Sequence, residues 1–286
     1  MPEHTGATRL DPIRGRRVSL GRSARRRTRR AGRPVMLVTQ AAVLVLGVLI
    51  WWAVSTQIPA DGVPSPVEAA RALGTLVTTG VFWAALWQTV QTFLLGILIC
   101  IVVGVPLGLA IGRSRIATQS TRLSFDFLRT IPPIAILPLV LLLYGPTPIM
   151  VLVMVVLGAI WPILIQSVYA AHQTEPQLDD MARAFQITGR RQVLRIFLPG
   201  VLPFVLTGLR VGTTICLLLT VTGELLGGAP GIGSSIITAQ QNLNNPQMYA
   251  YVVVAALLGL VVNAGFWAAQ RRVLHWHPSF RGEDAR

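Results

Sequence analysis

The stretch GILICIVVGVPLGLAIG, from Gly96 to Gly112, decides the fold, because it holds seventeen residues without a charge. It belongs to an apolar run, 86–111, that as a helix is long enough to cross a hydrocarbon core of about 30 Å. Gly96, Gly104 and Gly108 are spaced by eight and four residues, so they lie on one side of such a helix and allow another helix to approach closely. The stretch therefore predicts a membrane-spanning helix that packs tightly against a neighbour.

Five other apolar runs have the same character, at 35–55, 131–143, 149–169, 202–226 and 249–269. The first is longer than the apolar part of a signal peptide and lacks a small-residue cleavage site, so we interpret it as a retained anchor. The third is short and broken by prolines. No inverted repeat of the kind found in many secondary carriers is visible. The sequence therefore predicts an all-α integral membrane protein with six transmembrane helices.

The composition agrees with a lipid-facing chain and excludes several kinds of chemistry. Of the 286 residues, 52% are apolar and only 13% are charged, against about a quarter in ordinary globular domains. All 25 positive charges are arginines, so neither a GxxxxGK[ST] phosphate loop nor a lysine Schiff base can exist in this chain. Cys100 and Cys216 lie in apolar runs and indicate neither a disulfide framework nor a zinc site. We therefore expect no catalytic residue, no metal and no bound cofactor.

The arginines are distributed unevenly, and this fixes the expected orientation. Eleven fall in 1–33, and four each fall in 113–129, 174–195 and the segment after 269. The alternate loops, 56–85, 145–148 and 227–248, hold one arginine between them. Since cytoplasmic loops carry the excess of arginine, both termini are expected in the cytoplasm. The net charge of +14 is then a topology signal and does not indicate nucleic-acid binding.

These patterns divide the chain into five parts. They are a basic arm at 1–34, a first transmembrane anchor at 35–55, an extracytoplasmic loop at 56–85, a core of five helices at 86–269, and a cytoplasmic tail at 270–286. The arm has almost nothing apolar to bury and is expected to be disordered. It serves either as a solvated topology signal or as a ligand for anionic lipid headgroups.

The most informative cytoplasmic segment is TEPQLDDMARAFQITGRRQVLRIFLPGVLP, at 174–203. Thr174 and Gln177 have capping-box spacing, so a helix is expected to begin there, and Thr188 and Gly189 end it. Its apolar residues recur with helical spacing and form one stripe, made of Leu178, Met181, Ala182 and Phe185. Such a stripe must be buried, either on the chain's own membrane domain or in a groove of another protein.

The same segment resembles the signature loop of ABC importer permeases, whose pattern is roughly EAA, three residues, Gly, nine residues and I-x-LP. Asp180, Met181 and Ala182 stand at the EAA, Gln186 stands at the glycine, and Ile196, Leu198 and Pro199 complete the pattern. Gln186 adopts a positive φ less cheaply than glycine, so we expect the turn to be displaced to Gly189.

Three flanking segments support the resemblance and extend it over 86–269. FLRTIPPIAILPLVLLLYG, at 127–145, resembles the third helix of the nitrate/sulfonate/taurine subfamily. LPGVLPFVLTGLR, at 198–210, is similar to the start of the fifth helix of these permeases. TGELLGGAPGIG, at 222–233, is similar to the outer end of that helix in the subfamily. The resemblance implies a type I ABC importer permease.

The resemblance also implies a function and a set of partners. The chain would be a non-catalytic permease in the inner or plasma membrane of a bacterium, carrying a small anion or organic acid such as a sulfonate, nitrate or taurine. Its partners would be two cytoplasmic ATPases that use the ATP, a second permease chain, as a homodimer, an extracytoplasmic binding protein or lipoprotein, and membrane lipid. The residues expected to couple to the ATPases are Leu178, Asp180, Met181, Ala182, Arg183, Phe185, Gln186 and Gly189.

Polar residues inside the spans are the candidates for the substrate pathway or its gate. Glu224 is the only carboxylate in an apolar run, and it either lines the pathway, holds a gate closed or pairs with an arginine. Arg210 either snorkels to the cytoplasmic surface or meets an anionic substrate. Thr213, Thr214 and Gln88 are further candidates. For these residues, and for Thr89 beside Gln88, interhelical hydrogen bonds are the simpler interpretation. A short helix at 234–243, in the uncharged loop after Glu224, is expected to act as a gate or docking surface.

Two other functions are alternatives to an ABC importer permease. An intramembrane serine protease needs a histidine inside the membrane, whereas all four histidines lie in or beside the cytoplasmic segments. An ion-coupled secondary carrier is the stronger alternative, but it would normally show repeats or several buried carboxylates, and only Glu224 is available. Whether transport needs a separate ATPase distinguishes the carrier from the importer.

Overall fold

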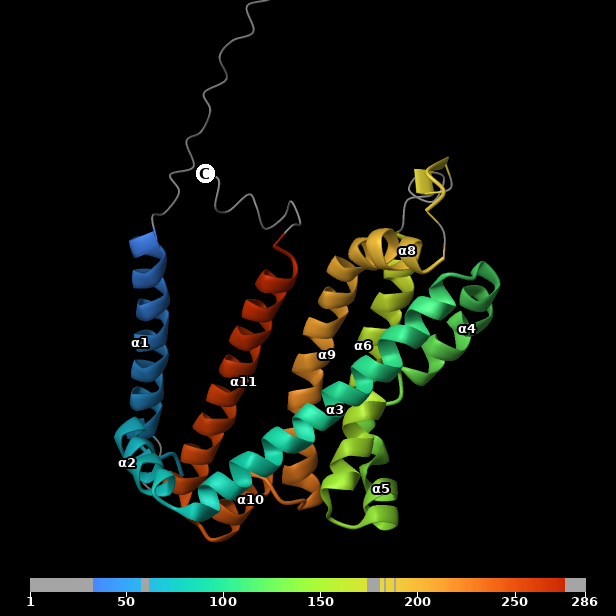
Figure 1. The fold of residues 1–286 in the computed structure, drawn as a ribbon. Helices are drawn as coiled ribbons and strands as arrows, with labels where there is room; N and C mark the ends of the chain where they lie inside the picture. Colours follow the sequence, from blue (N-terminus) through green and yellow to red (C-terminus); the bar gives the residue numbers. More distant parts are fainter. Residues whose placement is uncertain (1–32, 58–61, 174–180, 183, 188, 276–286) are drawn as a thin grey trace, which may run out of the picture. The chain divides into compact units, whose positions relative to one another are not determined.

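A computed structural model describes residues 33–57, 62–173, 181–182, 184–187 and 189–275, which contain helices and no strand (Figure 1). They fall into two units that divide between Leu49 and Ile50. Helix α1 (Arg33–Gln57) begins in the first unit and covers the predicted anchor. All other elements belong to the second unit. Most of the predicted arm and tail lies outside the described residues.

The second unit is a series of helices whose ends follow from local sequence. Thr79, Ser114 and Thr147 each accept a backbone hydrogen bond at a helix start, and Ser65 with Glu68 forms a capping box. The elements are α2 (Pro66–Val77), α3 (Gly80–Gly112), α4 (Arg115–Leu128), the 3-10 helix η1 (Pro133–Ile136), α5 (Leu137–Tyr144), α6 (Pro148–His172), α8 (Arg190–Gln192), the π-helix η2 (Val193–Phe197), α9 (Leu198–Gly227), α10 (Ile232–Gln241) and α11 (Asn245–Val273).

Four helical segments of the described chain are long and apolar enough to cross a membrane. They are α3, α6, α9 with its flanking helices, and α11. A fifth candidate is the pair formed by α4 and η1–α5, which is bent by 68°. The described apolar part of α1, Ala41–Gln57, is shorter than a span. The all-helical prediction is confirmed, and four to five of the six expected spans are present by this measure.

The core of the unit lies where α3, α6 and α9 pack together. Cys100, Met154 and Cys216 are completely buried there, one from each helix. The glycines of α3 face α6, as the spacing predicts. A Cβ atom at Gly108 would lie 2.6 Å from the carbonyl oxygen of Leu164, so only glycine permits this approach. Close backbone packing at the glycines therefore accompanies the side-chain packing of the core along this interface.

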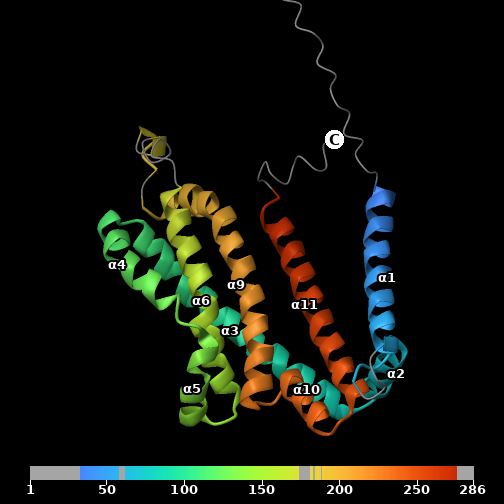
Figure 2. The ribbon, with the colours of Figure 1, turned by 180° about the vertical axis from the view of Figure 1, so that it is seen from behind.

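A second cluster of buried side chains joins α2, the start of α3, α10 and α11. Phe82 and Tyr251 stack there with ring centroids 6.2 Å apart, beside the completely buried Ile232. In Figure 2, α10 lies at the end of α9 opposite to α8. The predicted short helix at 234–243 is thus confirmed as α10, two residues earlier in the chain.

The segment 113–129, which sequence analysis treated as a cytoplasmic loop, contains the helix α4. Thr118 contacts His172 at the end of α6 (3.2 Å between Oγ1 and Nε2), whereas Phe125 lies beside Trp161, with ring centroids 6.0 Å apart. Helix α4 therefore folds back along the C-terminal half of α6. The expected third span, 131–143, is accordingly only the second arm of a bent helix pair, because Pro132 and Pro133 interrupt the helix.

Candidate functional site

Glu224 is buried near the end of α9, with 1% of its surface exposed. Its Oε2 atom accepts hydrogen bonds from Thr89 Oγ1 (2.8 Å) and from the backbone N–H of Gly233 (3.0 Å). The Thr89 hydroxyl in turn accepts from the backbone N–H of Ile232 (2.8 Å). One carboxylate thereby ties together α9, α3 and the start of α10.

The carboxyl group of Glu224 is hydrogen-bonded through one oxygen, Oε2, whereas Oε1 is buried without a hydrogen-bond partner. The first N–H groups of a helix have no partner inside the helix and carry partial positive charge, and Glu224 lies against those of α10. Gly231 packs directly on the carboxyl group, and a Cβ atom there would overlap it. With 1% of its surface exposed, Glu224 holds α9, α3 and the start of α10 together, and this hydrogen-bonded group is called the Glu224 lock below.

The other predicted pathway residues lie elsewhere. Arg210, Thr213 and Thr214 line a pocket of about 210 Å³ between α9 and α11, together with Asn263. The hydroxyls of Thr213 and Thr214 donate to carbonyl oxygens one turn earlier in α9, at 2.7 and 3.1 Å, so both are satisfied within their own helix. Arg210 precedes Glu224 by fourteen residues, which is about 21 Å along a helix. The structure therefore does not unite them in one site.

Gln88, the last of these candidates, is half-buried on α3 directly before Thr89. It is thus a neighbour of the Glu224 lock and not of the Arg210 pocket. Thr89, for which an interhelical hydrogen bond was the interpretation, makes one to Glu224, although only its neighbour Gln88 was selected as a site residue. The signal that could have found it is a hydroxyl among apolar residues at a position that faces the helix interface.

The described part of the coupling segment contains a helix end. Leu178, Asp180 and Arg183 lie outside the described residues. Met181 and Phe185 are exposed (55% and 72%), whereas Ala182 is buried (1%). The apolar stripe is therefore divided, with two large side chains presented outward and the small one packed inward.

The turn at the end of this helix falls on Gln186 itself, so the expected displacement to Gly189 alone is wrong. Gln186 has φ 55° and Gly189 has φ 60°, both left-handed. The N–H of Ile187 donates to the carbonyl oxygen of Ala182 (2.8 Å), which is the 6→1 bond of a Schellman motif with Gln186 at the left-handed position. The hydrogen bond holds glutamine in a conformation that is typical of glycine.

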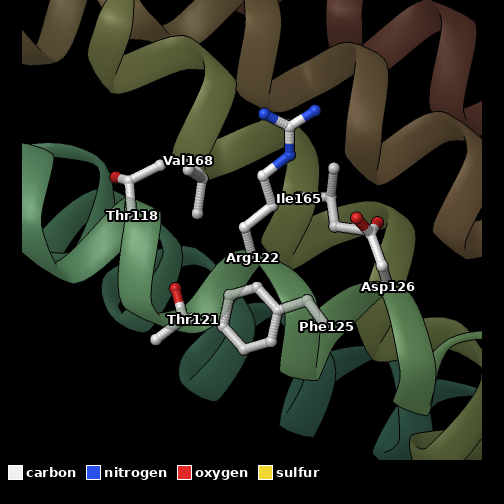
Figure 3. Close-up of a pocket in the computed structure, with 7 residues that line it drawn as sticks. All are labelled: Thr118, Thr121, Arg122, Phe125, Asp126, Ile165 and Val168. Carbon is white, nitrogen blue, oxygen red and sulfur yellow. The ribbon is translucent and has the colours of Figure 1, made fainter.

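A further pocket, which sequence analysis missed, lies at the bend between α4 and α5. It has a volume of about 430 Å³, and Arg129 is the one charged residue among those that line it in the described chain. Arg129 pairs with Asp126, at 3.1 Å between Nη2 and Oδ1. A smaller pocket between α4 and α6, shown in Figure 3, is lined by Arg122 and Asp126 among others. From the sequence, the arginines of 113–129 indicate only the orientation of the chain in the membrane. The sequence of this segment does not predict that α4 folds back along α6 and forms pockets with it.

Comparison with known proteins places the fold. The sequence profile of the family "Binding-protein-dependent transport system inner membrane component" matches residues 101–275. A permease of the MetNI methionine ABC transporter, in an inward-facing conformation, is similar in structure, with a TM-score of 0.59 at 19% sequence identity. The match covers 68% of this chain and 96% of that one.

Several bacterial permeases are similar in sequence. The nitrate import permease NrtB of Leptolyngbya laminosa is 30% identical over 67% of this chain and 69% of its own length. The taurine transport system permease TauC of Escherichia coli K12 is 28% identical over 80% of this chain and 86% of its own length. The bicarbonate transport system permease CmpB of Synechococcus elongatus is 27% identical over 80% of this chain and 87% of its own length.

Proposed function

Since the chain belongs to the family of binding-protein-dependent transport system inner membrane components, we propose that it forms the pathway for a small anion or organic acid and couples to its ATPases through the segment 174–197. As a bacterial inner-membrane permease subunit it is not an enzyme, and its system includes an ATPase and a substrate-binding protein. We further infer six spans, both termini in the cytoplasm and a homodimeric permease. The family match over 101–275 carries the proposal.

The coupling role is supported by the two outward side chains of the segment. Met181 and Phe185 are four residues apart, so they lie on one face, as a helix that docks in a groove requires. Ala182 is buried within the chain, so a large residue there would disturb the segment itself and would not report docking alone. The test therefore uses the exposed positions.

Phe185→Glu is expected to reduce co-purification of the ATPase subunits on the order of tenfold, because it places a charge in an apolar contact. Leu243→Glu is the matched control, since Leu243 is also an exposed apolar residue (85%) and follows α10, at the other end of α9. ATPase recovered with Phe185→Glu at the wild-type yield would contradict the coupling role.

The substrate class is supported by the relatives, whose names refer to nitrate, taurine and bicarbonate transport. The test is uptake of labelled nitrate, ethanesulfonate and taurine into proteoliposomes that contain the permease, its ATPase and its binding protein. ATP-dependent uptake of at least one of them is expected. Uptake driven by a proton or sodium gradient in vesicles without any ATPase would instead favour the alternative, an ion-coupled carrier.

A further inference from the structure

The pocket at the α4–α5 bend lies at the middle of the spanning helices. Gly158 is near the midpoint of α6, and a Cβ atom there would lie 2.8 Å from Cγ of Pro133 at the bend. Gly158 also lines the pocket, together with Leu218 and Leu219 from the last third of α9. Arg129, four residues before Pro133, thus places a charge beside apolar residues of two spanning helices, and charges within spanning segments are costly and, as a rule, functional.

The walls of this pocket are mostly apolar. Besides Arg129 they include Ile131, Trp161 and Leu218, and the side chain of Leu218 is 64% exposed. A guanidinium above apolar walls is weakly hydrated, and its fixed fork of donors suits two oxygens of one anion. The pocket thus offers an oxoanion one strong partner and little competition from other polar groups.

The charges of α4 are arranged so that Arg129 can be released from its ion pair. Arg122, Asp126 and Arg129 are spaced by four and three residues, so they share one face of the helix. Figure 3 shows the side chains of Arg122 and Asp126 on the same side of α4, the side of Ile165 in α6. Asp126 now contacts Arg129, and both are about half exposed. A carboxylate with an arginine on either side can transfer from one to the other, and the three groups keep a net charge of +1.

We propose that Arg129 is an anion-binding residue halfway along the pathway, that its ligand is a monovalent oxoanion such as a sulfonate or nitrate, and that Asp126 moves to Arg122 when the anion binds. The inference rests on the proposed function, which supplies the pathway, and it assigns the substrate contact to α4 instead of to Glu224 or Arg210. One net positive charge for each chain matches one monovalent anion.

The test measures the local charge directly and requires no transport. Leu218→Cys supplies a reporter thiol, and the native Cys100 and Cys216 are completely buried. In vesicles containing the permease with its ATPase, the thiol is labelled by anionic 2-sulfonatoethyl and by cationic trimethylammonioethyl methanethiosulfonate. The ratio of the anionic to the cationic labelling rate, divided by the same ratio for a free thiol, is expected to be on the order of ten. Ethanesulfonate is expected to slow the labelling.

Arg129→Gln is expected to abolish both the preference and the protection by ethanesulfonate, whereas Asp126→Asn is expected to increase the preference. Arg115→Gln is the control, because it removes one positive charge from α4 about 21 Å from Arg129. It is expected to change neither the reagent preference nor the protection by ethanesulfonate. An unchanged ratio in Arg129→Gln, or a Leu218→Cys thiol that neither reagent labels, would overturn the proposal. Should Leu218→Cys fail to assemble with the ATPase, Ile131→Cys reports on the same pocket.

Uptake gives a second readout that separates this inference from the proposed function. In Arg129→Gln, uptake of nitrate and ethanesulfonate is expected to fall about tenfold, while the ATPase co-purifies as with the wild type. In Arg115→Gln, uptake is expected to stay at the wild-type rate. If the wild-type complex imports neither anion, the proposed substrate class fails, and the labelling ratio alone still decides whether Arg129 attracts anions.

Discussion

Single residues in this chain matter most where a polar group is buried. Thr89 Oγ1 and Glu224 Oε2 are hydrogen-bonded to each other and accept from two backbone N–H groups at the start of α10, while Glu224 Oε1 is buried without a hydrogen-bond partner. In an apolar environment, each of these groups would be costly without its partner. The lock therefore depends on the chemistry of both side chains and not on their shape alone.

Thr89→Val removes the hydroxyl and keeps the shape, so it leaves the Ile232 N–H and the Glu224 carboxylate each without one partner. We expect the free energy of unfolding to fall by about 2–3 kcal/mol. Thermal unfolding of the detergent-solubilised protein measures this. Thr89→Ser retains the hydroxyl and is the control. Equal unfolding temperatures for the two variants would show that the hydrogen bonds contribute nothing.

Gln186→Gly is expected to stabilise the helix end after Ala182 by about 1 kcal/mol, because glycine adopts the left-handed conformation without the Cβ penalty. Slower hydrogen exchange of the Ile187 amide, which closes the motif, is the measurement. In the control, Gln240→Gly, the residue lies inside α10, where the same change is expected to cost about 1 kcal/mol. Faster exchange in Gln186→Gly would contradict the assignment of the turn.

At the scale of elements, the contact between α3 and α6 depends on small residues. Backbone atoms of the two helices come so close at Gly108 that a side chain has no room. The bend between α4 and α5 depends on the opposite property, because its prolines interrupt the helix. One face of α6 thus receives a straight helix and another receives a broken one, and the pocket forms beside the break.

Gly108→Ala is expected to destabilise the protein by about 1–3 kcal/mol, because the added methyl group meets the Leu164 carbonyl oxygen and the Ser167 side chain. Gly265→Ala in α11 is the control, since nothing lies within 4 Å of its Cβ position. There the substitution is expected to be neutral or stabilising, in accord with helix propensity. The measurement is the unfolding temperature of each variant. An unfolding temperature of Gly108→Ala as high as that of the wild type would mean that α3 and α6 are not in close contact at this position.

For the whole molecule, the arginine-rich ends of the helices lie on one side. In Figures 1 and 2 the C-terminal ends of α3, α6 and α11 and the start of α8 are at the same end of the second unit. The same segments carry the clusters at 113–115, 190–195 and 271–272. The end with α10 has almost no charge. This asymmetry is the basis for the orientation that we propose.

Impermeant thiol reagents test that orientation. With both native cysteines buried, Leu243→Cys after α10 is expected to be labelled from outside intact cells, and Phe185→Cys only in inverted vesicles. The two variants are controls for each other, because both residues are exposed. The reverse pattern would invert the orientation, with the coupling segment outside the cell.

The sequence by itself determined the all-helical class, the long apolar helices, the membrane location and the family, because apolar run length, glycine spacing and arginine distribution are local properties that lipid and water select directly. It did not determine α4, which it treated as a loop, or the bend that makes 131–143 the second arm of a helix pair. It also selected Glu224 and indicated an interhelical hydrogen bond for Thr89, but not that the two bond to each other, since 135 residues separate them. Only the tertiary structure decided that Ala182 is buried, that Gln186 forms the turn and that Arg129 lines a pocket together with residues of α6 and α9. These depend on which helix faces each residue, and the packing of α4 along α6 is not encoded in any single segment.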